Sequence, residues 1–464
     1  MKHVLAVTGF LTVFFLLCRD QVLTWPYYYD EADYLYAVSL GLQANYTDSP
    51  AQSLAEYIRT GLSASKDRAA ISAQIRASND VNFYRHWHGP LYCYWLLALA
   101  PAGLTEYTTR SLSYVFPVLT FLVIYFGCLW LLPAGEGFLA ALLSSAFYLW
   151  SYATVRTNEI APHALFVLCY LVALVLLMKW RSTGSDRYWY GAVMAAACAF
   201  CTLEVAFVLI LVMLACAAMD KKHTDARWMG KSLLLFGGSV MVLWPAAVVK
   251  LTFIKAYLFM AYLALFRKSA WGNVTFLETW RLRLTHSPWE WVLLGVSLVL
   301  YYRFCATATR RLLFPVLLYA GLMFLAVLRV NTDTPRYVLP YLPALHVVGG
   351  FVFADVLMKW RPIIRAVAAS GLCALLLWNT TSQILAHPIL PAPRLAAVLA
   401  ALRERDLEGK KLLAPQADLP MIHYYLPKIS IRGYADQDEQ SALLASEHFD
   451  AVLYPSESVK IATF

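Results

Sequence analysis

The stretch FPVLTFLVIYFGCLWLLPAGEGFLAALLSSAFYLW, residues 116–150, decides the fold class. It contains two long apolar runs and a single charged residue, Glu136, which lies in the short connection PAGEG between them. A helix that crosses a bilayer needs about 20 mostly apolar residues. The pattern therefore predicts two consecutive membrane-spanning helices joined by a tight turn.

The whole chain shares this character. Of its 464 residues, 60% are hydrophobic and only 14% are charged, and the mean hydropathy is +0.56. A soluble domain has about 45–50% apolar and about 25% charged residues. The net charge of +9 is dispersed as short basic clusters between apolar runs. These features exclude a soluble enzyme, a disordered chain and a nucleic-acid binder, and they predict contact with membrane lipid.

About eleven apolar stretches meet the length requirement for a spanning helix. They lie near residues 3–18, 110–132, 138–155, 163–180, 189–204, 205–219, 232–250, 289–304, 311–328, 337–357 and 363–380. We therefore expect an all-α polytopic membrane protein whose transmembrane domain is residues 1–380. The run 3–18 is interpreted as a retained span, because no small-residue cleavage pattern follows it.

The orientation follows from the basic residues, which collect in cytoplasmic connections. With the N-terminus inside, all but one of the inner connections are basic. These residues are Lys2, Lys179, Arg181, Arg187, Lys221, Lys222, Arg227, Lys231, Arg303, Arg310, Arg311, Lys359, Arg361 and Arg365. The N-terminus is thus predicted to be cytoplasmic, and segments 19–109, 251–288 and 381–464 are predicted to face the other side.

The three outer segments are too long and too structured in pattern to be simple connections. Within 19–109, residues 53–78 have helical spacing with a polar face, and residues 90–104 are interpreted as an interfacial helix. Segment 251–288 is similarly amphipathic. The tail 381–464 alternates helix-like and strand-like runs, which predicts a small extracytoplasmic α/β domain. We expect this domain to act as a lid or a docking surface.

Ionisable residues cluster on the predicted outer side, where each is costly next to lipid. For any single Arg or Glu, an ordinary interfacial role is about as good an explanation as function. For the adjacent carboxylates in WPYYYDEADYLY (25–36), a functional role is favoured, because carboxylates gain no stabilisation from contact with lipid. The clustered residues are Asp30, Glu31, Asp33, Arg85, His86, His88, Arg110, Arg156, Glu159, His163, Glu204, Asp333 and Arg336.

The order of these residues resembles the GT-C class of membrane glycosyltransferases that use polyprenyl-phosphate sugars, especially the protein O-mannosyltransferase and aminoarabinose transferase branch. The resemblance covers residues 1–350 and consists of short spaced motifs. They are a DE pair after the first span (Asp30-Glu31), a His-x-Pro-Leu element (His88 to Leu91), an Arg opening the second span (Arg110), Arg-x-x-acid (Arg156, Glu159) and Arg-Tyr before prolines (Arg336-Tyr337).

The chain departs from the family pattern at two positions. Gly89 stands where the family has the first proline of a His-Pro-Pro-Leu motif, and Glu204 stands where many relatives carry a lysine. The second departure puts the usual lysine–phosphate contact in doubt. We expect that contact to fall to one or more of the outer cations Arg85, Arg110, Arg156, Arg336 and Lys255.

The resemblance implies transfer of a sugar from a polyprenyl-phosphate carrier to an acceptor, with inversion at the anomeric carbon. Asp30 is then the expected general base and Glu31 the substitute candidate. Donor binding falls to His88, Arg110, Arg156, Glu159, Arg336 and Tyr337. No cofactor and no metal ligand is required, although a divalent cation near Asp30 is compatible with this arrangement. The acceptor is a protein, a lipid or a glycan.

The residues alone leave other classes open. A lipid or anionic-solute transporter or flippase would use the same buried charges, although no inverted repeat is visible. A non-catalytic assembly protein is a third class, but it would not explain the adjacent carboxylates and the basic residues on the outer side. We expect a bacterial inner membrane with a periplasmic C-terminal domain; an endoplasmic reticulum membrane also fits the pattern.

Overall fold

The structure, a computed structural model, describes most of the chain. The described residues are 1–19, 25–27, 30–39, 88–157, 160–219, 225–245, 275–328, 330, 334–387, 393–415, 418–434, 436–454 and 460–463. The predicted helix at 53–78 and residues 251–274 of the predicted outer segment 251–288 therefore lie outside the described residues.

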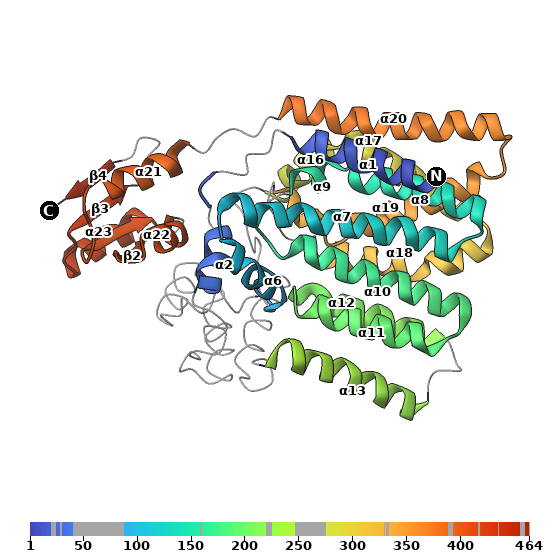
Figure 1. Ribbon diagram of the computed structural model, residues 1–464, viewed down its shortest axis with the longest axis horizontal. Helices are drawn as coiled ribbons and strands as arrows, with labels where there is room; N and C mark the ends of the chain where they lie inside the picture. The colour runs from blue at the N-terminus through green and yellow to red at the C-terminus, as the bar shows by residue number, and fades with distance from the viewer. Residues whose placement is uncertain are drawn as a thin grey trace.

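A bundle of long helices running alongside one another forms the main body (Figure 1). Each predicted apolar stretch overlaps one of these helices. They are α1 (Lys2–Cys18), α7 (Glu106–Leu131), α8 (Ala134–Leu149), α10 (His163–Thr183), α11 (Asp186–Phe200), α12 (Phe207–Met219), α13 (Ala226–Leu243), α17 (Pro288–Phe304), α18 (Thr307–Val327), α19 (Leu342–Leu357) and α20 (Pro362–Ala386).

The observed helices include fewer that meet the length and hydropathy requirements for a membrane span than the sequence pattern predicts. Among the described residues, only four helices, α7, α10, α18 and α20, are both long and apolar enough to cross a membrane by these measures alone. Helices α1, α8 and α19 are apolar but shorter. The fold is therefore that of a mainly helical protein with several apolar helices, and the number of crossings stays a prediction.

Helices α8 and α19 form the centre of the bundle and are buried along nearly their whole length. They approach each other closely because the residues at their contact have small side chains. The backbone of Gly350 lies against Ser144, and a Cβ added to Gly350 would come within 2.0 Å of the Ser144 hydroxyl oxygen. Small residues permit such close helix contacts when no hydrophobic effect drives association.

The predicted span 138–155 is interrupted, which corrects the sequence interpretation. Helix α8 ends at Leu149, and a separate short helix, α9 (Tyr152–Arg156), follows it. The Thr380 hydroxyl donates a hydrogen bond to the Trp150 carbonyl oxygen, which satisfies an acceptor that the helix end leaves without an intrahelical partner. The break places Arg156 on an element of its own.

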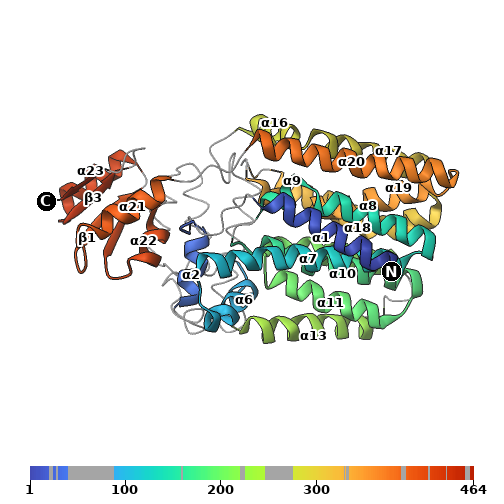
Figure 2. The ribbon, with the colours of Figure 1, turned by 45° about the horizontal axis from the view of Figure 1, so that its top comes forward.

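The two ends of the bundle differ in character. At one end lie the short elements α2 (Asp30–Ser39), α6 (Leu91–Leu99), α9 and α16 (Phe276–His286) (Figures 1 and 2). Helix α6 and the 3-10 turn η3 (Ala100–Ala102) confirm a helix within the predicted interfacial segment 90–104. At the other end, Lys179 donates to the Trp130 carbonyl oxygen at 2.8 Å near the end of α7.

The C-terminal residues form a four-stranded sheet with helices beside it. The strand order is β2-β1-β3-β4, with β1 parallel to β2 and β3 and with β4 antiparallel to β3. The bounds are α21 (Pro393–Arg403), β1 (Lys411–Pro415), α22 (Leu419–Tyr425), β2 (Ser430–Tyr434), α23 (Gln437–Ser446), β3 (Ala451–Tyr454) and β4 (Lys460–Thr463). The helix–strand alternation matches the predicted pattern, except that β4 was not expected.

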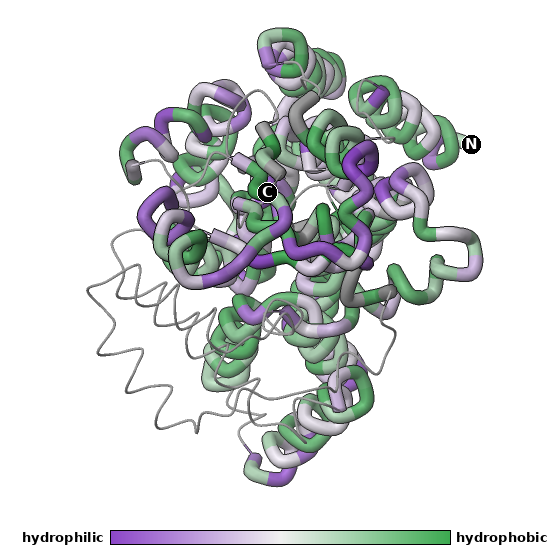
Figure 3. Tube along the Cα trace, turned by 90° about the vertical axis from the view of Figure 1, so that its left-hand side faces the viewer, coloured by the Kyte–Doolittle hydropathy of each residue, from purple (hydrophilic) through white to green (hydrophobic). Residues whose placement is uncertain are grey.

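This C-terminal unit lies at the end of the bundle that carries α2 and α6 (Figures 1 and 2). Figure 3 looks at the molecule from that side: hydrophilic residues are prominent in the unit nearest the viewer, and the helices behind it are mainly hydrophobic. The contrast fits a water-exposed unit on an apolar bundle. That residues 381–464 are an independent domain on the outer side stays a prediction.

The close contact of Gly350 with Ser144 predicts a specific sensitivity. Gly350→Ala should destabilise the bundle by about 1–3 kcal/mol, because its methyl group meets backbone and cannot be accommodated by a side-chain rotation. Gly371→Ala on α20 is the matched control: nothing lies within 4 Å of a Cβ placed there, so it should be neutral or stabilising by about 0.5–1 kcal/mol. Thermal unfolding of the two variants in detergent measures the difference; equal effects would contradict this account of the packing.

Candidate active site

A buried ion pair joins α2 to α7 at the end of the bundle that carries the short elements. Arg110 donates from Nε to Glu31 Oε1 at 3.0 Å and from Nη2 to Glu31 Oε2 at 2.6 Å. The two residues, Arg110 and Glu31, are 5% and 6% exposed. The backbone N–H of Ile160 also donates to Glu31 Oε1, at 3.1 Å. Glu31 thus holds together three segments that are distant in sequence.

Arg110 also fixes the loop that precedes α2. Its Nη1 donates to the Trp25 carbonyl oxygen at 2.6 Å, and its Nη2 donates to the Pro26 carbonyl oxygen at 3.2 Å. The guanidinium carbon lies 5.5 Å from the centre of the Tyr27 ring. Tyr27 is fully buried, and burial raises the pKa of its hydroxyl above the ordinary value. Arg110 is therefore an anchor for residues 25–27.

Asp30 is the first residue of α2. Its side chain lies outside the described part of the structure, as does the whole of Glu159. The neighbouring Glu31 is fixed by its ion pair, and Arg110 holds the backbone on the other side of Asp30. The backbone position of Asp30 is therefore set from both directions, whereas its predicted role as a base stays a prediction.

His88 pairs with Glu204, a residue that stands out in the sequence only as a departure from the family pattern. His88 Nδ1 lies 2.8 Å from Glu204 Oε2, and the imidazole stacks on the Tyr34 ring of α2 at 6.2 Å. Glu204 begins the 3-10 turn η4 (Glu204–Ala206) between α11 and α12, which is the turn expected there. The contact fixes the orientation of the imidazole relative to this turn.

The geometry also explains why residue 89 is glycine. A Cβ on Gly89 would lie 2.1 Å from the carbonyl oxygen of Cys201. The adjacent Leu91 N–H donates to that same oxygen at 3.0 Å. The backbone around Gly89 therefore packs directly against the end of α11. Any side chain at position 89, proline included, would clash there and would move His88 away from Glu204.

His163 connects two groups of predicted site residues, although no motif assigns it a role. It is buried at the start of α10, and its ring meets the Tyr337 ring edge-on at 5.6 Å. His88 and Arg336 both lie near enough to act on it electrostatically. The Arg336 guanidinium lies 5.1 Å from the Tyr337 ring centre. His88, Arg336 and Tyr337 are thereby brought into one neighbourhood.

Arg156 occupies the other side of this end of the bundle. Its Nη2 donates to the carbonyl oxygens of Ile384 (3.1 Å) and His387 (2.6 Å) at the end of α20. Its guanidinium lies over the Tyr152 ring at 5.7 Å. Within the described residues no carboxylate pairs with Arg156. Among the described residues, Arg156 is thus held by carbonyl oxygens, whereas Arg110 is held by a carboxylate as well.

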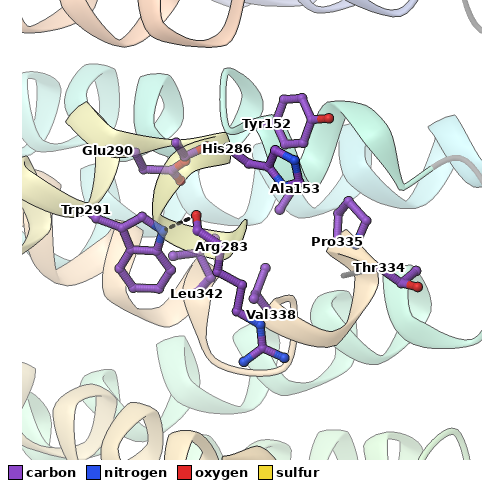
Figure 4. A pocket seen from close by; sticks show the side chains of 11 residues that line it. Tyr152, Ala153, Arg283, His286, Glu290, Trp291, Thr334, Pro335, Val338 and Leu342 are labelled. Carbon is purple, nitrogen blue, oxygen red and sulfur yellow. Dashed lines mark hydrogen bonds between the residues drawn. The ribbon is translucent and has the colours of Figure 1, made fainter. Parts of the chain in front are cut away.

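A pocket lies among α9, α16, α17 and the turn η6 (Pro335–Val338) that carries Arg336. Figure 4 shows His286 and Glu290 on one side of it and the Arg283 guanidinium on another. Burial lowers the pKa of Arg283 from its ordinary value. The lining includes Tyr152, Arg283, His286, Glu290, Thr334 and Leu342. The sequence gives no sign of this pocket, because its residues belong to no motif.

No group of three or more His, Cys, Asp or Glu side chains suited to a metal ion is found within the described residues. Because Asp30 and its neighbours on the loop are only partly described, a metal requirement is not tested by this observation.

Similarity to known proteins bears on the fold. No family model matches the chain, and no curated protein matches it in sequence. Among solved structures, ArnT from Cupriavidus metallidurans bound to undecaprenyl phosphate is similar over 96% of this chain and 88% of that one, with a TM-score of 0.62 and 14% identity. The apo state of ArnT gives a TM-score of 0.59 at 13% identity, with the same coverage.

An archaeal enzyme shares the architecture as well. The oligosaccharyltransferase AglB from Archaeoglobus fulgidus, solved with an inhibitory peptide and a dolichol-phosphate, matches 93% of this chain with a TM-score of 0.57 and 12% identity. The chain spans 64% of the length of AglB. The fold implied by the motifs is thus confirmed: this chain has the fold of the GT-C membrane glycosyltransferases.

Because Glu31 and Arg110 form a buried pair, we expect that replacing one of them is more destabilising than its share of the loss when both are replaced. Glu31→Gln should destabilise the protein by about 3–5 kcal/mol, because it leaves a buried guanidinium without its counter-ion. The double variant Glu31→Leu/Arg110→Met should be less destabilised than the sum of its single variants. Thermal unfolding of the double variant and of each single variant gives the coupling energy, and simple additivity would show that the pair does not act as a unit.

Proposed function

We propose that this protein is an integral membrane glycosyltransferase that moves a sugar from a polyprenyl-phosphate carrier to an acceptor on the outer side of the membrane. The observation that carries the proposal is the gathering of the motif residues at one end of a GT-C fold. Glu31 contacts Arg110 and the loop before α10, and His163 lies near His88, Arg336 and Tyr337. A fold alone would not support a function.

The geometry favours Asp30 over Glu31 as the general base. Glu31 accepts hydrogen bonds from both Nε and Nη2 of Arg110 and from the Ile160 N–H. Both carboxylate oxygens of Glu31 are thereby occupied by donors of the protein itself, which leaves this side chain poorly placed to take a proton from an acceptor. Glu31 is therefore assigned a positioning role, and Asp30, at the start of α2, receives the proton of the acceptor.

The contacts with the donor phosphate fall to cations other than Arg110. Arg110 already donates to Glu31 and to two carbonyl oxygens, so it positions the loop rather than the phosphate. Arg156 lies on α9 and Arg336 on η6, two of the elements that line the pocket, although neither side chain is itself among the lining residues. They are assigned to the phosphate, which suits the forked geometry of guanidinium. His88, which pairs with Glu204, is assigned to the phosphate as a further hydrogen-bond donor in place of the lysine of relatives.

The proposed reaction is a single displacement. An acceptor hydroxyl gives its proton to Asp30 while its oxygen attacks the anomeric carbon of the sugar. The bond between that carbon and the phosphate oxygen breaks, and the polyprenyl phosphate leaves with the electron pair. Its charge is stabilised by the arginines and His88. Attack opposite to the leaving group inverts the anomeric centre.

The decisive experiment replaces the proposed base. A deletion strain complemented with Asp30→Asn should accumulate one lipid-linked sugar and lose one glycan residue, because a positioned general base contributes ~10²–10⁴-fold to the rate. Mass spectrometry of polyprenyl-phosphate sugars and of surface glycans identifies both substrates in the same experiment.

Asp186→Asn is the matched control, because Asp186 is an exposed aspartate at the start of α11 and is predicted to lie on the opposite side of the membrane. It should behave as wild type at the same protein level. If Asp30→Asn also matches wild type while the deletion strain differs, the base assignment is wrong, and transport of the lipid or of an anionic solute becomes the better explanation.

The proposed role of His88 gives a separate prediction for binding. Glu204→Gln should weaken the binding of undecaprenyl phosphate by roughly ten-fold, because hydrogen bonds that involve a charged group are stronger than neutral ones and the amide holds His88 less firmly. Glu278→Gln, an exposed change on α16, should leave the affinity unchanged. Titration in detergent, followed by tryptophan fluorescence, compares the two. An unchanged affinity in Glu204→Gln would remove His88 from the phosphate site.

A further inference from the structure

The C-terminal unit contacts the bundle through two adjacent tyrosines of α22. The hydroxyl oxygen of Tyr425 accepts a hydrogen bond from the backbone N–H of Tyr27 at 2.8 Å, and the hydroxyl donates to Glu106 Oε1 at 2.5 Å. The hydroxyl of Tyr424 donates to the Leu104 carbonyl oxygen at 3.3 Å. Helix α22 therefore contacts both the loop before α2 and the first turn of α7.

The rings strengthen this contact. Tyr27 stacks on Tyr425 at 5.9 Å and meets Tyr424 edge-on at 5.1 Å. The Tyr27 hydroxyl forms a hydrogen bond with the Thr109 hydroxyl at 2.9 Å, one residue before Arg110. Helix α22 also packs against α2 itself. The C-terminal unit thus contacts both α2, which begins with Asp30, and α7, which carries Arg110.

Residues 25–27 are held from two sides. Arg110 donates to the carbonyl oxygens of Trp25 and Pro26, and the Tyr425 hydroxyl oxygen accepts from the N–H of Tyr27. A backbone polar group that is buried without a partner is strongly unfavourable. The loop conformation that presents Asp30 is therefore complete only when α22 is docked.

We propose that Tyr425 is a positioning residue for the transfer reaction: its hydroxyl links the C-terminal unit to the loop 25–27, which precedes Asp30 and Glu31 at the start of α2. This inference rests on the proposed function, and it gives the C-terminal unit a more specific role than that of a lid or docking surface. Tyr425 itself touches no reacting atom.

The chemistry of the hydroxyl suits this role. Burial and the hydrogen bond to Glu106 raise the pKa of Tyr425 above its ordinary value, so the group keeps its proton at neutral pH. It then acts as a donor to the carboxylate and as an acceptor for the backbone N–H at the same time. Phenylalanine would preserve the ring stacking and remove both hydrogen bonds.

The test compares Tyr425→Phe with Tyr424→Phe, which removes the hydroxyl that donates to the Leu104 carbonyl oxygen. Hydrogen–deuterium exchange of the full-length protein in nanodiscs should rise in peptides covering residues 25–39 for Tyr425→Phe. Sugar transfer in the complemented strain should fall roughly ten-fold, as expected from loss of a buried hydrogen bond with its partners left unpaired. Tyr424→Phe should change both quantities much less.

Binding of undecaprenyl phosphate separates positioning from general damage. It should stay within about two-fold of wild type in Tyr425→Phe, because the affected loop carries the base and not the phosphate site. As a second variant, Glu106→Gln should retain transfer, since its amide oxygen still accepts from Tyr425, whereas Glu106→Ala should resemble Tyr425→Phe.

Two results would overturn the inference. Wild-type exchange and transfer in Tyr425→Phe would show that the hydroxyl positions nothing. An equal loss in Tyr424→Phe and Tyr425→Phe, with undecaprenyl phosphate binding lost in both, would show that α22 contributes only to overall folding. Failure of the proposed function is distinguishable from both, because wild type itself would then transfer no sugar.

Discussion

The arrangement at the functional end of this protein depends on one buried charge pair. Arg110 and Glu31 are both almost inaccessible, and either charge alone would be strongly unfavourable in that environment. Because the two side chains come from α7 and α2, which are linked by a long intervening segment, the pair fixes where the first loop can lie. The carbonyl oxygens of residues 25 and 26 and the N–H of Ile160 complete the hydrogen bonding of the pair. The pair therefore positions the elements that surround the candidate site.

The elements of the fold were largely predictable from the sequence, because its strongest signal is hydrophobicity along the chain. Every predicted apolar stretch overlaps a helix, and the C-terminal pattern located β1 and most of its neighbours. The break after Leu149 was not predictable, since it depends on Thr380, a residue 230 positions from the Trp150 carbonyl that it contacts. Strand β4 was also missed, because its four residues carry too short a pattern.

The sequence predicts which residues belong to the candidate site, but it does not predict which of them pair with one another. The motif order identified Glu31, Arg110 and His88, yet nothing in the spacing indicates that Glu31 neutralises Arg110. Glu204 was visible only as a departure from the family, and its contact with His88 requires the fold to be known. Gly89 was a second departure, and the Cys201 carbonyl oxygen explains it. In both cases a substitution that looked unfavourable in isolation is matched by a neighbour.

The docking of α22 has a consequence for how the protein is made. Tyr27 and Tyr425 are separated by 398 positions, so a ribosome reaches the second tyrosine only after it has synthesised α20, the last helix of the bundle. Until then the first loop lacks a hydrogen-bond acceptor that the finished protein provides. A chain truncated before α22 would have its helices but an incompletely ordered loop. The order of synthesis thus places the completion of this loop among the last steps of maturation.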